Sequence, residues 1–178
     1  MQEAAINPTT AVAFRDMVVK GHWAMEAKNT AEVIRRIPAD KTEFKPHEKS
    51  TPMGQLARHI FNSEAMFVDG LCDGKFDYQA SMKKLGEHPA DPKKLADQYV
   101  QWQEGAVARL MKLTPEQLVK PIQFHPSMPA MPAFQYLGWM TSHTIHHRAQ
   151  LTVYLRLTGA KVPAIYGGSA DENPFAAK

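Results

Sequence analysis

The sequence predicts an all-α fold, a four-helix bundle, and three observations support this prediction. Apolar residues recur every three to four positions over four long segments, as in amphipathic helices. No segment shows the sustained alternation of β-branched residues that a strand needs. Prolines, glycines and capping residues separate the four segments. Four helices with one apolar face each bury those faces most economically against one another.

The first two helices are bounded by proline, capping residues and glycine. The first is expected over about residues 10–36, and Pro38 ends its periodic pattern. A loop rich in charge and proline follows. The second helix is expected to start at residues 50–52, where Ser-Thr-Pro combines a capping residue with a first-turn proline, and to end at Gly74.

The last two helices have similar signals. Asp-Pro starts the third, which is expected over about residues 91–113. The sequence TPEQ at 114–117 fits a capping box and predicts a short turn of helix. After a loop with four prolines, the fourth helix is expected over about 132–157, with Gly159 as its C-terminal cap.

The composition is that of one soluble globular domain. The chain has 178 residues, of which 44% are hydrophobic and 22% charged. We therefore expect a single domain over residues 1–178, with a bundle core at about 10–159 and a loop-like tail at 160–178 that could pack over one end. No apolar run is long enough for a membrane span, and the N-terminus lacks a secretory signal pattern, so a cytoplasmic location is expected.

Charge and cysteine content narrow the classes of partner. The net charge of +3 comes from scattered basic pairs with acids between them, so we expect neither a nucleic-acid nor a membrane partner. Cys72 is the only cysteine, which rules out an intrachain disulfide. Its expected role is that of a small core residue.

The fourth helix carries three histidines in the sequence SHTIHHRAQL, residues 142–151. His143 and His147 lie roughly 40° apart on one helix face, which we expect to be the centre of the core-facing stripe, with His146 at its flank. Ring nitrogens buried away from water need partners. Hydrogen bonds are one solution; a metal ion is another, because histidines at i and i+4 form a two-ligand clamp.

A metal site needs a further ligand from another helix, and His59 is the candidate. It lies at the edge of the apolar stripe of the second helix. Three histidines from two facing helices leave open coordination positions, as in catalytic zinc sites, whereas structural zinc sites are usually closed by four protein ligands.

Three stretches of the sequence resemble a known family. HTIHHRAQLTVYLRLTG at 143–159, followed by VPAIYGGSADE at 162–172, resembles the C-terminal part of the DinB/YfiT-like family. LARHIFNSE resembles the second-helix histidine segment of that family. The resemblance spans nearly the whole chain, and it is to the damage-inducible four-helix-bundle proteins rather than to the polymerase that shares the label.

The resemblance implies an up-down-down-up bundle, frequent homodimers, and a divalent metal, often nickel or zinc, with three histidine ligands. The implied ligands are His59, His143 and His147. The motif also contains Arg148 and Gln150, and it places His146 beside the ligands or in an interface. Separately, His125 in the proline-rich loop is a candidate for the mouth of the site. We therefore also consider four residues beside the ligands or at the site mouth: His146, Arg148, Gln150 and His125.

Such a site permits two chemistries, because a divalent metal lowers the pKa of a bound water or thiol. Characterised relatives of the family include S-transferases that use bacillithiol and maleylpyruvate isomerases that use mycothiol. A low-molecular-weight thiol and an electrophilic small molecule are therefore the expected partners. Hydrolysis would profit from a general base, but Thr144 follows His143 where an HExxH motif has glutamate. This difference favours thiol transfer. Hydrolysis is the alternative, and its general base would come from Glu64, the first helix or the FHP loop.

Two further hypotheses do not involve catalysis. In the first, the protein is a dimeric module that binds a metal or a small ligand, and its site has no open coordination position and no bound water. In the second, the histidines form a hydrogen-bonded cluster without a metal.

Overall fold

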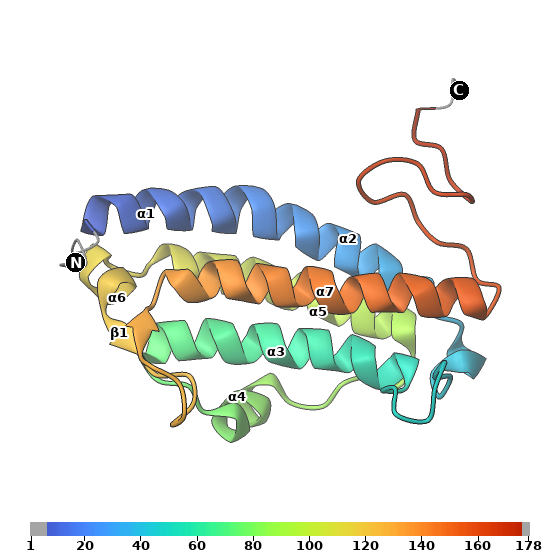
Figure 1. Cartoon of the computed structure of the whole chain (residues 1–178), viewed down its shortest axis with the longest axis horizontal. Coiled ribbons are helices and arrows are strands. Elements are labelled where there is room, and N and C mark those ends of the chain that lie inside the picture. Colours follow the sequence, from blue (N-terminus) through green and yellow to red (C-terminus); the bar gives the residue numbers. More distant parts are fainter. Residues whose placement is uncertain (1–6, 176–178) are drawn as a thin grey trace.

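The computed structural model describes residues 7–175 and forms a bundle of four long helical segments (Figure 1). The predicted all-α bundle is therefore confirmed. Residues 1–6 and 176–178 of the expected domain and tail lie outside the described residues. The elements are α1 (Pro8–Asp16), the π-helix η1 (Met17–Trp23), α2 (Ala24–Arg35), the 3-10 helix η2 (Ala39–Lys41), α3 (Met53–Asp73), α4 (Tyr78–Leu85), α5 (Pro92–Met111), α6 (Pro115–Val119), β1 (Pro121–Ile122), β2 (Met131–Pro132) and α7 (Gln135–Leu157).

The helices follow the expected up-down-down-up order (Figure 1). Helices α1, η1 and α2 are contiguous and form the first long segment; α3 and α5 both run antiparallel to it, and α7 runs back alongside α3. The connection through α4 crosses back along the bundle, because the parallel neighbours α3 and α5 need a crossover. Helix α2 packs against α5 and α7, and α3 packs against α7 and α5. None of the described helices combines the length and hydropathy of a membrane span.

Several predicted helix ends are confirmed. The side chain of Asp91 caps α5 by accepting a hydrogen bond of 2.9 Å from a first-turn backbone N–H. Thr114 and Gln117 form the expected capping box of α6. Gly74 and Gly159 follow α3 and α7 in the left-handed region, with φ of 71° and 74°, which glycine adopts without steric cost.

The second helix starts close to the expected position, but the predicted capping of α3 was wrong. Pro52 occupies the capping position, and no side chain caps this helix. The expected start of α7 at Pro132 was early, because Pro132 belongs to β2. A two-residue antiparallel ladder joins β1 and β2, and such a pairing is too short to give a periodic signal in the sequence.

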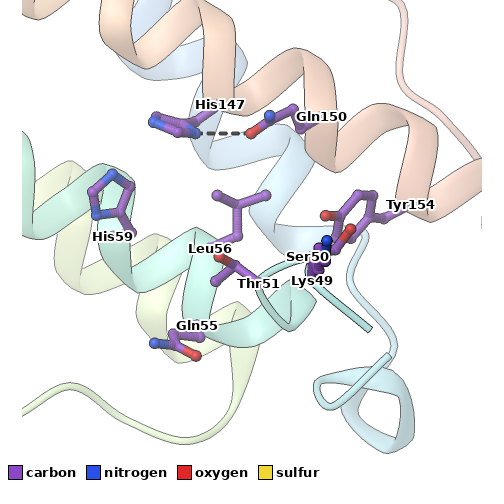
Figure 2. A pocket seen from close by; sticks show the side chains of 9 residues that line it. All are labelled: Lys49, Ser50, Thr51, Gln55, Leu56, His59, His147, Gln150 and Tyr154. Atoms are coloured by element: carbon purple, nitrogen blue, oxygen red, sulfur yellow. Dashed lines mark hydrogen bonds between the residues drawn. The ribbon is translucent and has the colours of Figure 1, made fainter. Parts of the chain in front are cut away.

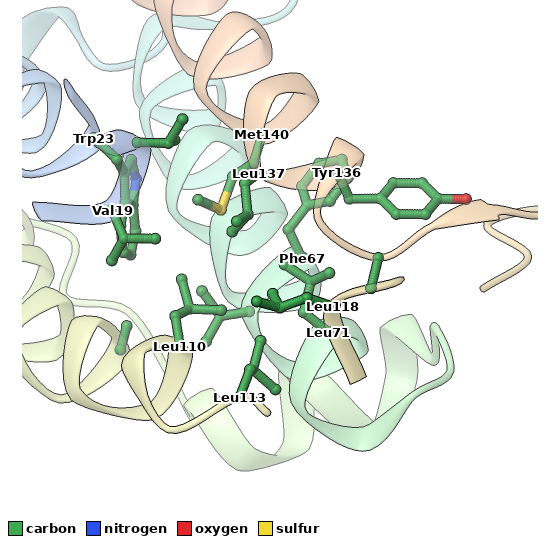
Figure 3. Close-up of a cluster of buried hydrophobic side chains, with 14 of the residues drawn as sticks. Val19, Trp23, Phe67, Leu71, Leu110, Leu113, Leu118, Tyr136, Leu137 and Met140 are labelled. Carbon is green, nitrogen blue, oxygen red and sulfur yellow. The ribbon is translucent and has the colours of Figure 1, made fainter. Parts of the chain in front are cut away.

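The apolar core consists of two clusters. One, shown in part in Figure 3, lies toward α1 and includes Trp23, Phe67, Leu110 and Met140. The other lies toward the C-terminal end of α7 and includes Ile34, Ile60 and Leu151. Along α2, α3 and α7, buried polar residues lie between the two clusters. We call these residues, with the α5 tyrosine bonded to them, the polar layer: Glu26, Thr30, Glu64, Tyr99, Thr144 and Arg148.

The described part of the tail packs against the bundle. Val162 and Ile165 contact the second apolar cluster. Glu172 forms an ion pair with Arg36 of the first helical segment. The tail therefore leaves the C-terminal end of α7 on the side of α2 (Figure 1), and the hydroxyl of Tyr166 bonds to Glu26 of α2 and to Arg148 of α7.

Candidate metal site

The structure brings the three predicted ligands together. His59 on α3 meets His143 and His147 on the antiparallel helix α7, and one ring nitrogen of each lies within 4.8 Å of those of the other two. The Nε2 atoms of His143 and His147 are 3.2 Å apart. Figure 2 shows His59 and His147 facing each other across the space between the two helices. The fold therefore assembles a three-imidazole cluster from two helices.

The cluster lies at the edge of the core, whereas the sequence predicted that His143 and His147 would lie at the centre of the core-facing stripe. His143 and His147 are half-buried and His59 is exposed. The buried centre of α7 contains Thr144 and Arg148, which are 0% and 2% exposed. A helical wheel based on apolar residues misses a buried arginine, so it places the buried face too far toward the histidines. The edge position leaves the cluster accessible to solvent.

The surroundings favour neutral imidazoles. Burial, together with the neighbouring histidines, lowers the pKa of His143 to about 4. Burial also lowers the pKa of His59 and of His147. The three rings are therefore neutral at pH 7, and a neutral imidazole is the form that binds a metal.

Gln150 fixes the orientation of His147. The Nδ1 atom of His147 lies 2.8 Å from the side-chain carbonyl oxygen of Gln150, which accepts its N–H. The tautomer with hydrogen on Nδ1 leaves the lone pair on Nε2, the atom that faces His143. Partners of this kind orient histidine ligands in metalloproteins.

Replacing Gln150 by leucine is expected to lower Zn²⁺ affinity by about 10- to 100-fold, because His147 loses the bond that sets its tautomer. Competition with a chromophoric chelator measures the effect. Gln150→Glu retains an acceptor and should bind Zn²⁺ as the wild type does, as should Gln55→Leu, which alters another glutamine of the neighbouring pocket. Wild-type affinity in Gln150→Leu would contradict the assigned role.

The cluster opens into a pocket of about 380 Å³ between the start of α3 and the second half of α7 (Figure 2). His59 and His147 form part of its wall. The remaining lining is mostly polar, with hydroxyls, amides and one ammonium group. Its residues are Lys49, Ser50, Thr51, Gln55, Leu56, Gln150 and Tyr154. A small molecule can therefore reach the histidines from solvent.

The other residues considered near the site lie in different surroundings. The ring of His146, an exposed residue, is centred 4.9 Å from that of His147. His125 bonds to Ser127 at 2.7 Å within its own exposed loop. Cys72 is half-buried near the end of α3, and burial raises its pKa. The structure thus places Gln150 and His146 beside the cluster and gives His125 a partner within its own loop.

Arg148 belongs to the polar layer and not to the mouth of the pocket. Its guanidinium pairs with the Glu26 carboxylate at 2.5 Å, and both side chains are buried. The hydroxyl of Tyr166 accepts a hydrogen bond from Arg148 at 2.6 Å and donates one to Glu26 at 2.7 Å. This ion pair and the Tyr166 hydroxyl link α2, α7 and the tail, at the residue of α7 that follows His147.

Glu64, the candidate general base, is also in the polar layer. Its carboxylate accepts hydrogen bonds from Thr144 at 2.5 Å and Tyr99 at 2.8 Å. Burial raises its pKa to about 7, although these hydrogen bonds oppose the shift. Glu64 is 0% exposed and does not line the pocket. It supports the core behind the cluster and does not face a molecule in the pocket.

The raised pKa of Glu64 predicts a pH dependence of stability. Between its ordinary pKa of 4.5 and about 7, the native state binds a proton that the unfolded state has lost, so the free energy of unfolding falls as pH rises. Glu64→Gln removes this dependence. From pH 4.5 to 8, the variant should gain up to about 3 kcal/mol relative to the wild type.

Urea denaturation of both proteins with a chelator present, at several pH values, measures this difference. Groups that titrate identically in the two proteins cancel in the comparison. A difference in unfolding free energy that stays constant across this pH range would contradict the raised pKa.

Comparisons with known proteins agree with this architecture. The DinB family profile matches residues 14–174. The Bacillus subtilis protein YjoA is 29% identical over 142 residues, which are 79% of this chain and 89% of YjoA. YrdA of the same organism is 25% identical over 151 residues, which are 84% of this chain and 87% of YrdA.

Two crystal structures share the fold. That of the DinB-like protein YjoA from Bacillus subtilis superposes with a TM-score of 0.68, at 29% identity, over 83% of this chain and 96% of YjoA. A DinB-like protein from Bacillus cereus superposes with a TM-score of 0.66, at 22% identity, over 83% of this chain and 95% of its own. The second similarity supports the fold alone.

Proposed function

This chain belongs to the DinB family, and we propose that it is a metal-dependent enzyme that transfers the sulfur of a small thiol to an electrophilic small molecule. One observation carries the proposal: three histidine nitrogens from α3 and α7 lie within 4.8 Å of one another beside an open pocket. The proposed metal is a divalent ion, nickel or zinc, and its proposed ligands are His59, His143 and His147.

The residues present fit such an ion. Nitrogen ligands suit zinc and nickel. Two nitrogens bonded to one zinc at about 2.0–2.1 Å with tetrahedral angles lie about 3.3 Å apart, close to the 3.2 Å between the Nε2 atoms of His143 and His147. Gln150 directs the Nε2 lone pair of His147 toward the same point.

A divalent ion held by the three imidazoles would supply Lewis acidity and would make a thiolate available near neutral pH. The chain itself contributes position and access. The histidines keep the reacting end of the pocket in place, and the polar lining binds the body of the substrate. In the reaction, the thiol loses its proton to a solvent base, its sulfur bonds to the electrophilic carbon, and the leaving group departs with the electrons of its bond.

The same geometry favours thiol transfer over hydrolysis. A hydrolase profits from a carboxylate or histidine that deprotonates water. Among the described residues that line the pocket, no side chain is a carboxylate, and the two histidines, His59 and His147, are proposed metal ligands. Glu64 is in the core, bonded to Thr144 and Tyr99. A thiol ionises more readily than water and depends less on such a base.

A transfer assay tests the proposal. Protein loaded with one equivalent of Zn²⁺ or Ni²⁺ is mixed with N-acetyl-L-cysteine and 1-chloro-2,4-dinitrobenzene, and thioether formation is followed by absorbance. We expect the loaded wild type to be at least about tenfold faster than His147→Ala, a difference of about 1.4 kcal/mol in the barrier. Bound metal without acceleration would contradict transferase activity and favour the non-catalytic binding module.

A homodimer is proposed from family membership alone. Size-exclusion chromatography with light scattering tests it, and a mass of one 19.9 kDa chain would contradict it.

A further inference from the structure

The charged groups in the lining of the pocket are of one sign. Among the described residues that line it, Lys49 alone carries a formal charge, and the others are hydroxyl, amide, imidazole or apolar side chains. No ion pair in the described part of the chain includes Lys49. Its ammonium group is therefore available to a molecule in the pocket.

The ligand set adds to this imbalance. Imidazole is a neutral ligand, so His59, His143 and His147 would leave both positive charges of a divalent ion without a compensating carboxylate ligand. Glu64 is buried in the core, where its carboxyl group is hydrogen-bonded to Thr144 and Tyr99, and it does not line the pocket. The histidine end of the pocket would therefore also attract negative charge.

The two positive regions are separated. Figure 2 shows Lys49 beside Ser50 and Tyr154, on the opposite side of the pocket from His59. Thr51 and Leu56 lie in the lining between these sides, and they offer one hydroxyl and one aliphatic side chain. The volume of about 380 Å³ is at the small end of ligand sites. A complementary molecule is small and polar, with one anionic group placed away from its reacting atom.

From this arrangement we propose that the pocket takes carboxylate-bearing small molecules and that Lys49 is the residue that selects the carboxylate. The proposal rests on the proposed function, because the reacting atom of the molecule is placed at the histidine cluster. It goes further in naming the substrate class and a specificity residue outside the metal ligands.

A matched pair of probes tests the role of Lys49. N-acetyl-L-cysteine and N-acetyl-L-cysteinamide have the same thiol and differ in one charge. Calorimetric titration of the Zn²⁺-loaded protein gives the ratio of their two dissociation constants. We expect Lys49→Met to reduce the preference for the acid by about fivefold, the value of an exposed ion pair, with little effect on the amide.

Two control variants accompany it. Lys49→Arg retains the charge and should keep the wild-type ratio. Lys45→Met alters a lysine of the same loop that does not line the pocket and should keep it too. Differences in thiol acidity between the probes cancel because each variant is compared with the wild type.

The outcomes separate this inference from the proposed function. If both probes bind and Lys49→Met keeps the wild-type ratio, carboxylate selection by Lys49 is wrong while the metal-dependent function stands. If the protein binds no Zn²⁺, or neither probe binds the loaded protein, the proposed function fails and this inference fails with it.

Discussion

Replacing His59 or His143 by alanine is expected to lower Zn²⁺ affinity by more than about 100-fold. Loss of a residue that merely orients a ligand costs about 10- to 100-fold, and loss of one of three nitrogen ligands should exceed it. The three nitrogens lie within 4.8 Å of one another on two packed helices, so no adjacent group in the cluster replaces the missing one. Competition with a chromophoric chelator measures the affinity.

Two other histidines provide controls for this effect. His146 is exposed beside His147, and His125 is bonded within its own loop. Alanine at either position should leave Zn²⁺ affinity within about threefold of wild type, since neither belongs to the three-nitrogen cluster. Equal losses in all four variants would indicate nonspecific binding to surface histidines.

The metal-free alternative makes a different prediction for the same variants. In a hydrogen-bonded cluster, His143 would donate from Nε2 to the lone pair of His147, 3.2 Å away. His143→Ala would then change the free energy of unfolding and leave metal content unchanged. Loss of metal in that variant excludes this alternative.

Replacing Arg148 by methionine is expected to destabilise the protein by about 3–5 kcal/mol, because Glu26 would remain buried without its counter-charge. The two groups are 2.5 Å apart and are 2% and 0% exposed on their side chains. Urea denaturation measures the free energy of unfolding. The effect is expected with and without metal, since Arg148 lies in the polar layer and not in the cluster.

A double variant distinguishes the ion pair from simple loss of packing. Glu26→Leu combined with Arg148→Met removes both charges and should recover most of the lost stability. Tyr166→Phe, which removes the hydroxyl bonded to both groups, should cost about 1–3 kcal/mol. If Glu26→Leu lowers the free energy of unfolding of Arg148→Met further, as an independent core substitution would, the ion pair does not explain the loss.

Much of the fold could be predicted from local signals. The apolar spacing predicted four long helices, and Asp91, the capping box at Thr114, Gly74 and Gly159 mark ends that the structure confirms. These signals act within one turn of helix, so no tertiary information is needed to recognise them. The up-down-down-up order of the four helices was implied by the resemblance to the family and not by the spacing of apolar residues.

Features that depend on tertiary contacts were missed. The π-helical stretch η1 and helix α4 were not predicted, and neither departs visibly from ordinary helical composition. The polar layer was missed as well, although Glu64 lies at a stripe position, four residues after Ile60, where burial was to be expected. An acid within an apolar stripe indicates a partner on another helix, but the identity of that partner requires the structure.

The candidate site was predictable in its residues but not in its surroundings. The spacing of His143 and His147 identified a pair, and the second-helix segment identified His59. Their position at the edge of the core, the bond from His147 to Gln150 and the pocket with Lys49 all depend on how α3 packs against α7.

Elemental analysis of the wild type shows whether the three histidines hold a metal ion. The protein is purified without chelator or added metal, incubated with Ni²⁺ or Zn²⁺, and dialysed beside His147→Ala. We expect close to one equivalent of a divalent metal per wild-type chain and almost none in the variant. A wild type that holds no metal after this treatment, or a variant that holds as much metal as the wild type, would contradict the three-histidine metal site.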